Sequence, residues 1–143
     1  MSTQTTKQIA LDHLDRLNKG DVAGAAALMA PDCINHAAVP SAQGRKGFEA
    51  IAQKLRAAFP DMSYKLEDAL ADGDRVMLRV TATGTNTGTF AMTHLSFPPT
   101  GKTVTFEQIH VVRIANNQIV EHWLGQDTFA FMRQLGLRIT AEA

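Results

Sequence analysis

Two long stretches, residues 103–114 and 118–127, constrain the fold of this chain more than any other feature, because both alternate like strands and only a short turn joins them. The turn is Ala115-Asn116-Asn117, and Asn tolerates the left-handed backbone that a tight hairpin requires. Successive side chains of a strand point to opposite faces. We therefore expect a long antiparallel hairpin whose two faces differ in character.

On each stretch one face mixes polar side chains with large apolar ones. On the first stretch this face is formed by Phe106, Gln108, His110 and Val112. On the second stretch the alternation predicts a face formed by Ile119, Glu121, Trp123, Gly125 and Asp127. A sheet packed on a plain apolar core has no use for Gln, His and Asp there, whereas a sheet curled around a ligand does. The pattern indicates a sheet that encloses a small-molecule pocket.

The remaining elements follow from the spacing of apolar residues and from turn residues. The predicted helices run from Thr6 to a stop at Gly20 and over residues 22–29, 45–58 and 128–135. The predicted strands, besides the hairpin, cover residues 32–36, 62–70 and 75–85. Three helices followed by an antiparallel meander predict one α+β domain over residues 1–143, with residues 1–5 frayed. Helices gathered on one side of a strongly curved, mostly antiparallel sheet would enclose a cone-shaped pocket.

Composition narrows the functional classes. Fourteen basic and fourteen acidic residues leave no surplus of positive charge for nucleic acid or an anionic membrane. Cys33 is the one cysteine, which excludes an intramolecular disulfide and a Cys-rich metal site. The polar start of the chain lacks a signal-peptide core, and no apolar run approaches the roughly 20 residues of a membrane helix. We therefore expect a soluble cytoplasmic protein.

No residue pattern points to a cofactor or a metal ion. The five histidines form no HxH or HxxxH pair, and the sequence contains no GxGxxG, Walker A or GxSxG element. The apolar loop over residues 90–101 is better suited to a lid or a subunit contact than to a solvated turn. We expect a small-molecule site that works without a cofactor or metal.

Six short segments carry a resemblance to a known family. They are Asn35-His36, Ala58-Phe59-Pro60-Asp61, Asp72-Gly73-Asp74-Arg75-Val76, Gly84-Thr85-Asn86-Thr87-Gly88, Pro99-Thr100-Gly101-Lys102 and Ile119-Val120-Glu121-His122-Trp123 followed by Asp127. In this order and spacing the chain resembles the SnoaL-like polyketide cyclases of the nuclear-transport-factor-2-like superfamily. The resemblance implies a cone-shaped α+β barrel and a cofactor-free intramolecular aldol condensation on a small, apolar, carbonyl-rich ligand. The superfamily also contains isomerases, dehydratases, hydrolases and non-catalytic binders, so these alternatives stay open.

The resemblance also implies roles for four polar residues. It assigns the catalytic acid/base to Asp127, with Asn35, Gln108 and His110 as its polar neighbours, and His110 is a second catalytic candidate. Burial beside the predicted cavity walls Trp123 and Phe106 would make Asp127 a better base near neutral pH. The alternative is structural, because Asp127 directly precedes the last predicted helix and Asp is a favoured N-cap.

The other histidines are assigned by their neighbours in the sequence. Asn35 and His36 are adjacent on a strand, so only one can point inward; the family pattern favours Asn35, and His36 is kept as a second ligand contact. His122 has the opposite parity from Asp127, which predicts a contact with another layer or a subunit. His13 lies on a charged helix and is expected to face solvent.

Two further expectations concern surfaces and water chemistry. An apolar outer sheet face, formed by Val76, Leu78, Val80, Val111 and Val120, predicts a homodimer or higher oligomer. A hydrolase or dehydratase that activates water would need a second carboxylate near Asp127, and Glu121 is the nearest candidate in the sequence.

Overall fold

The predicted hairpin forms the centre of the sheet in the computed structural model. Its strands are β6 (Thr103–Ala115) and β7 (Gln118–Gln126). Asn116 and Asn117 both have positive φ, 52° and 61°, and two such residues give the turn that matches the twist of the flanking strands. The hairpin prediction is confirmed.

The sheet has five strands in the order β1-β7-β6-β3-β2, and it is strongly curved but not closed. Its other strands are β1 (Met29–Asn35), β2 (Ser63–Asp72) and β3 (Arg75–Thr85). β1 runs parallel to β7, and every other neighbouring pair is antiparallel. The edge strand β1 therefore comes from the helical half of the chain and lies beside the second strand of the hairpin.

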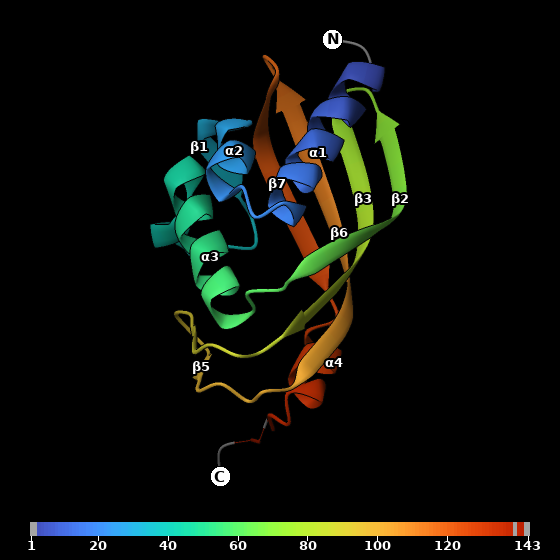
Figure 1. Ribbon diagram of the computed structural model, residues 1–143. Coiled ribbons are helices and arrows are strands. Elements are labelled where there is room, and N and C mark those ends of the chain that lie inside the picture. Colours follow the sequence, from blue (N-terminus) through green and yellow to red (C-terminus); the bar gives the residue numbers. More distant parts are fainter. Residues whose placement is uncertain (1–2, 139, 142–143) are drawn as a thin grey trace.

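The structure describes residues 3–138 and 140–141, and its helices are α1 (Thr3–Asn18), α2 (Val22–Ala27), α3 (Gly44–Ala58) and α4 (Thr128–Gln134), with a short 3-10 turn η1 (Pro40–Ala42). In Figure 1, α1 crosses the face of the sheet, α2 and α3 lie beside β1, and α4 lies at the far end of β6. This arrangement confirms the α+β fold with a curved sheet and helices over its inner face.

Several predicted boundaries are wrong by a few residues. α1 begins at Thr3, so residues 3–5 are helical rather than frayed, and residues 1–2 lie outside the described part. α2 ends at Ala27, and Met29 already belongs to β1. Pro31 is tolerated there because β1 is an edge strand.

Two hydrophobic cores lie under the sheet. The first packs α1 and β1 against the middle strands, and includes Leu14, Met29, Val76, Val80 and Ile119. Val76, Leu78 and Val80 are 0%, 5% and 0% exposed. The prediction that these three valine and leucine side chains form an outer, oligomeric surface is therefore wrong, because they face the helices.

The second core is aromatic and lies at the α4 end of the sheet. It is formed by buried residues that include Phe59, Phe90, Phe97, Phe106 and Phe131. Phe90 and Phe97 come from two short strands, β4 (Phe90–Ala91) and β5 (Ser96–Phe97), and their rings stack with centroids 4.7 Å apart. The apolar residues of this loop thus fill a core, which accounts for them without a lid or a subunit contact.

Asn86 holds the loops that close this aromatic core, and its side chain is fully buried. Its amide nitrogen donates to the carbonyls of Ala58 and Gly88, and its amide oxygen accepts from the backbone and the hydroxyl of Thr100. A Cβ on Gly88 would lie 1.8 Å from the carbonyl oxygen of Ala57. The Gly-Thr-Asn-Thr-Gly segment is therefore explained by packing and hydrogen bonding.

Candidate functional site

An extra residue in β7 decides which side chains face the interior. Ile114 pairs with Ile119, but Arg113 pairs with Glu121, so Val120 is inserted between two ladder positions. Such a bulge reverses the alternation of the strand beyond it. Side chains of β7 after the bulge that were expected on the inner face of the sheet therefore lie on the outer face. Those expected on the outer face lie on the inner one.

His122 is the residue that this reversal brings inward, and it joins a line of four polar side chains. Nε2 of His122 lies 2.9 Å from Nδ1 of His110, and Nδ1 of His122 lies 3.3 Å from Oδ1 of Asn35. At the other end, Nε2 of His110 lies 2.9 Å from the amide of Gln108, which also bonds Gln126 at 2.9 Å. The prediction that His122 contacts another layer or a subunit is wrong, because the bulge turns its side chain into the interior, where it meets His110 and Asn35 of the same sheet.

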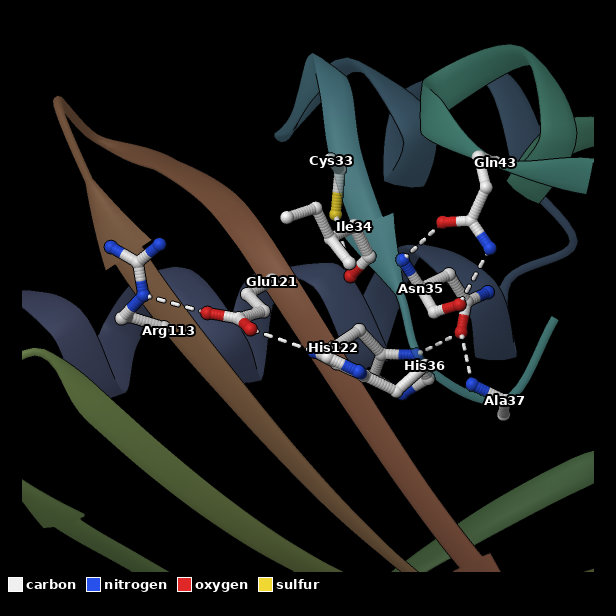
Figure 2. Close-up of polar contacts among 9 residues, drawn as sticks. All are labelled: Cys33, Ile34, Asn35, His36, Ala37, Gln43, Arg113, Glu121 and His122. Carbon is white, nitrogen blue, oxygen red and sulfur yellow. Dashed lines mark hydrogen bonds and ion pairs between the residues drawn. The ribbon is translucent and has the colours of Figure 1, made fainter. Parts of the chain in front are cut away.

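The end of β1 positions Asn35 at this line. Asn35 is the register partner of His122 in the parallel ladder, and its side chain is 7% exposed. The side-chain amide of Gln43 accepts from the backbone N–H of Asn35 and donates to its carbonyl, and so replaces a neighbouring strand. Figure 2 shows these bonds, together with the contact of Asn35 with His122. Asn35 is thus buried, but the cavity wall does not include it, and its contact with a ligand stays a prediction.

A cavity of about 60 Å³ lies between α1, α3 and the sheet. Its wall is mostly apolar and is formed by Ala10, His13, Leu14, Leu17, Met29, Phe48, Leu78, His110, Val112, Ile119 and His122. No carboxylate belongs to this wall within the described part of the chain. Any acid/base chemistry in the cavity would therefore fall to imidazole groups.

All three histidines of the wall are weak bases. Burial lowers the pKa of His13 to about 4, that of His110 to about 4 and that of His122 to about 3. Repulsion from neighbouring imidazoles lowers the pKa of His110 and His122 further. Each ring is neutral at pH 7, so each offers one donor nitrogen and one acceptor nitrogen.

The number of protons on His110 and His122 depends on which way the side-chain amide of Gln108 is turned. Oδ1 of Asn35 accepts from the backbone N–H of Ala37 at 3.2 Å, so Nδ1 of His122 donates to it. If Oε1 of Gln108 faces His110, Nε2 of His110 must also donate a proton. A third proton is needed for the hydrogen bond between the two rings, so the pair of histidines would carry one positive charge. In the neutral form the Gln108 amide is turned over and donates to Nε2 of His110.

Asp127 lies outside this interior. It is exposed, precedes α4 and accepts the backbone N–H of Ala130 at 3.0 Å through its side chain. It belongs to a shallow outer groove with Glu107, Ile109, Gly125 and Gln126. The expected burial of Asp127 beside Trp123 and Phe106 is wrong, because the bulge in β7 turns this end of the strand outward. The helix-capping alternative describes its position.

Trp123 and His36 form a second cluster on the outer side of the hairpin. Their rings stack with centroids 4.8 Å apart, and the guanidinium of Arg75 lies 5.3 Å from the Trp123 centroid. Nε2 of His36 contacts Glu121 at 2.7 Å, and Nε of Arg113 donates to the same carboxylate at 2.9 Å (Figure 2). Trp123 is therefore no wall of the cavity, and His36 does not reach it.

These contacts also decide the predictions made for Phe106 and Glu121. Phe106 is buried on the predicted face, but it packs on Phe131 in the aromatic core rather than against the cavity. Glu121 is bound to His36 and Arg113, which lowers the pKa of its carboxyl, and is not near Asp127. Glu121 and Asp127 therefore do not form the pair of carboxylates that a water-activating enzyme would require.

His13 was expected to face solvent, and that prediction is wrong. It lies on the wall of the cavity, and its ring is 5.3 Å from that of Phe48. The sequence did contain a signal, because Ala10, His13, Leu14 and Leu17 share one helix face at the spacing i, i+3, i+4, i+7. The charged residues between them concealed this face.

The described part of the chain offers neither a cluster of metal ligands nor a membrane-spanning helix. Among residues 3–138 and 140–141, no three His, Cys, Asp or Glu side chains are grouped so that they could hold a metal ion. In that same part of the chain, no helix combines the length and the apolar character that crossing a membrane requires.

Comparison with known proteins identifies relatives. A family model described as SnoaL-like polyketide cyclase matches residues 7–135. AclR of Streptomyces galilaeus, a proposed hydroxylase, is 26% identical with a TM-score of 0.79, and the match covers 94% of this chain and 98% of AclR. IdmH of Streptomyces antibioticus, a proposed polyketide cyclase, is 27% identical with a TM-score of 0.74, over 92% and 99% of the two chains.

TsrD of Streptomyces laurentii has a TM-score of 0.83 at 23% identity, over 96% of this chain and 99% of TsrD, which supports the likeness of fold. No curated protein matches the sequence significantly.

Proposed function

The chain belongs to the SnoaL-like polyketide cyclase family, and from this premise we propose that it is a cofactor-free acid/base enzyme for a small, apolar, carbonyl-containing compound. The proposed site is the cavity between α1, α3 and the sheet. One observation carries the proposal: an apolar wall is combined with a line of interior polar groups, Asn35, His122, His110 and Gln108. Apolar pockets with a few convergent polar groups are the usual form of a small-molecule site.

The proposed chemistry is the removal and return of a proton next to a carbonyl group, as in an intramolecular aldol closure. A neutral imidazole suits both steps, because one nitrogen accepts a proton while the other donates. The low pKa values of His13, His110 and His122 keep them in this neutral form at pH 7. In this proposal the imidazoles take the role expected of Asp127, which caps α4.

The size of the cavity limits the ligand. Its volume of about 60 Å³ is smaller than the roughly 150 Å³ that admits a benzene molecule. A ring-sized ligand therefore requires α1 and α3 to move away from the sheet. The proposed substrate is a compact compound, or one part of a longer compound.

A non-catalytic binding protein is the second candidate. It is favoured by the fact that His110 and His122 have every ring nitrogen in a hydrogen bond, so neither has a free lone pair for a substrate. The predicted homodimer is kept as a proposal for either function. Sedimentation velocity at micromolar concentration tests it, and a pure monomer would contradict it.

The decisive experiment measures hydrogen–deuterium exchange at the α-carbons of acetone, a compact ketone, in D2O. Wild type, Asp127→Asn and His13→Asn are compared, with binding followed by ligand-detected NMR, because His13 is the imidazole of the wall whose second nitrogen has no hydrogen-bond partner among the described residues. We expect wild type and Asp127→Asn to accelerate exchange equally, and His13→Asn to be slower by about a hundredfold.

Each other outcome has a definite meaning. Loss of exchange in a folded Asp127→Asn would return the acid/base role to that carboxylate and contradict the imidazole proposal. Binding of acetone by wild type without any exchange would favour the non-catalytic binder.

A further inference from the structure

The tautomer of His13 is fixed by its hydrogen bond to a backbone carbonyl of α2. Nδ1 of His13, on α1, lies 2.9 Å from the backbone carbonyl of Ala25, on α2. A carbonyl oxygen only accepts, so Nδ1 carries the proton and donates it. Because a neutral imidazole has a single N–H, Nε2 of His13 is left as an acceptor with a free lone pair.

This acceptor has no partner among the described residues, and its ring belongs to the cavity wall. Among the described residues, no hydrogen bond reaches Nε2 of His13, whereas every fully enclosed side-chain nitrogen and oxygen there has a partner. Nε2 is therefore not sealed by protein, and the ring to which it belongs forms part of the cavity wall. His110 and His122 offer no such atom, because their nitrogens bond each other, Asn35 and Gln108.

The surroundings of His13 favour a neutral ligand. Apart from the neutral rings of His110 and His122, the wall is apolar and includes Leu14, Leu17 and Phe48. The flanking charges on α1, Asp12 and Arg16, are paired with each other at 3.1 Å. A charged ligand would lose its hydration without gaining an opposite charge, whereas a hydroxyl group would gain an acceptor.

We propose that Nε2 of His13 accepts a hydrogen bond from a hydroxyl group of the ligand, and so selects a neutral ring compound with a phenol or enol O–H over one without it. The inference rests on the proposed function only in that both use the same cavity. Nothing in it requires turnover, so it can be tested by binding alone.

The test compares the affinities of phenol and benzene, measured by NMR titration, for wild type, His13→Asn and His94→Asn. In His13→Asn the side-chain amide can still donate to the Ala25 carbonyl, but no acceptor remains at the position of Nε2. His94 is exposed in the β4–β5 loop and gives a matched control. We expect the ratio of phenol affinity to benzene affinity to fall about tenfold in His13→Asn and to stay unchanged in His94→Asn.

Wild-type protein gives an independent reading if His13→Asn does not fold. A long-range 1H–15N spectrum at pH 7 should show His13 protonated at Nδ1 only, with the Nε2 resonance shifting as phenol is added. An unchanged affinity ratio in His13→Asn, or an Nε2 resonance that ignores phenol, overturns the inference and leaves the proposed function intact. If neither phenol nor benzene binds the wild type, both the inference and the proposed ligand site are wrong.

Discussion

The two halves of the interior under the sheet are built for opposite purposes. At the α4 end, the phenylalanines fill the space, and the side chain of Asn86 satisfies four polar groups of the loops that close it. At the α1 end, the same sheet leaves a cavity whose wall contains three neutral imidazoles. One half is complete without a ligand, and the other keeps a free acceptor on His13.

The most recognisable sequence motif and the candidate site lie in different halves of this interior. The Gly-Thr-Asn-Thr-Gly segment is conspicuous in the sequence, but it belongs to the filled half and has a packing role. The histidines of the open half are scattered over α1, β6 and β7 and meet only in the fold. Functional residues in this chain are therefore found by asking which polar groups border unfilled space.

The pH dependence of stability should show the largest contrast between the halves. Unfolded histidines titrate near 6.5, but burial lowers the pKa of His13 and His110 to about 4 and that of His122 to about 3. Between these values the unfolded chain binds more protons, so stability is complete above pH 6.5 and is lost as the pH falls toward 4. We expect a loss on the order of 5 kcal/mol, since water near half-buried rings offsets part of the full effect.

Urea unfolding from pH 7 to pH 4 measures this loss. His13→Asn serves as the internal control, because removing one of the three groups should flatten the profile. A free energy of unfolding that does not change between pH 6.5 and 4.5, above the range of most carboxylates, would contradict neutral interior imidazoles.

Removing the polar anchor of the filled half should have the next largest effect. Asn86→Ala leaves the carbonyl of Gly88 and the backbone N–H of Thr100 without their partner. It also removes one of the two bonds to the carbonyl of Ala58, and we expect a loss of about 3 kcal/mol. Urea denaturation measures it, with the exposed Thr93→Ala as a control within about 0.5 kcal/mol. The phenol to benzene ratio should be unaffected in a folded Asn86→Ala protein; a changed ratio would mean that the two halves are coupled.

The sequence predicts those features of the fold that depend on neighbouring residues. The hairpin, its turn at Asn116 and Asn117, and the face shared by Gln108 and His110 follow from alternation and from turn chemistry. Local rules of this kind are sufficient because each involves neighbouring residues.

The second half of β7 could not be predicted in the same way. Ile119, Glu121 and Trp123 alternate as plausibly as Val120, His122 and Leu124, and nothing local announces the bulge at Val120. One inserted residue exchanges the two faces, which moved Asp127 and Trp123 out of the predicted site and brought His122 into it. The choice is made by pairing with β1 and β6, which is tertiary information.

The role of Asp127 can be isolated by two substitutions with a smaller effect. Asp127→Ala removes the N-cap of α4, and we expect a loss of about 1 kcal/mol in urea unfolding. Asp127→Asn should retain nearly all of the stability, because Asn caps as well as Asp. Should Asp127→Asn be as unstable as Asp127→Ala, the carboxylate would have an interaction beyond capping.

The outer cluster should have the smallest effect. His36→Asn breaks an exposed contact with Glu121 and the stacking on Trp123, and we expect urea unfolding to show a smaller loss of stability than for Asp127→Ala. Binding of phenol in the cavity should be the same in this variant as in wild type, as an NMR titration would measure. A weakened affinity would show that the outer cluster communicates with the interior site.

The central claim is that, among the residues that the structure describes, neutral imidazoles and no carboxylate form the polar wall of the cavity. Its most direct test is an NMR titration of the histidine ring signals of the wild-type protein from pH 8 downward. The account predicts that His13, His110 and His122 stay neutral through pH 6, with each ring holding one proton. Protonation of any of these three rings at or above pH 6.5 in the folded protein would contradict it.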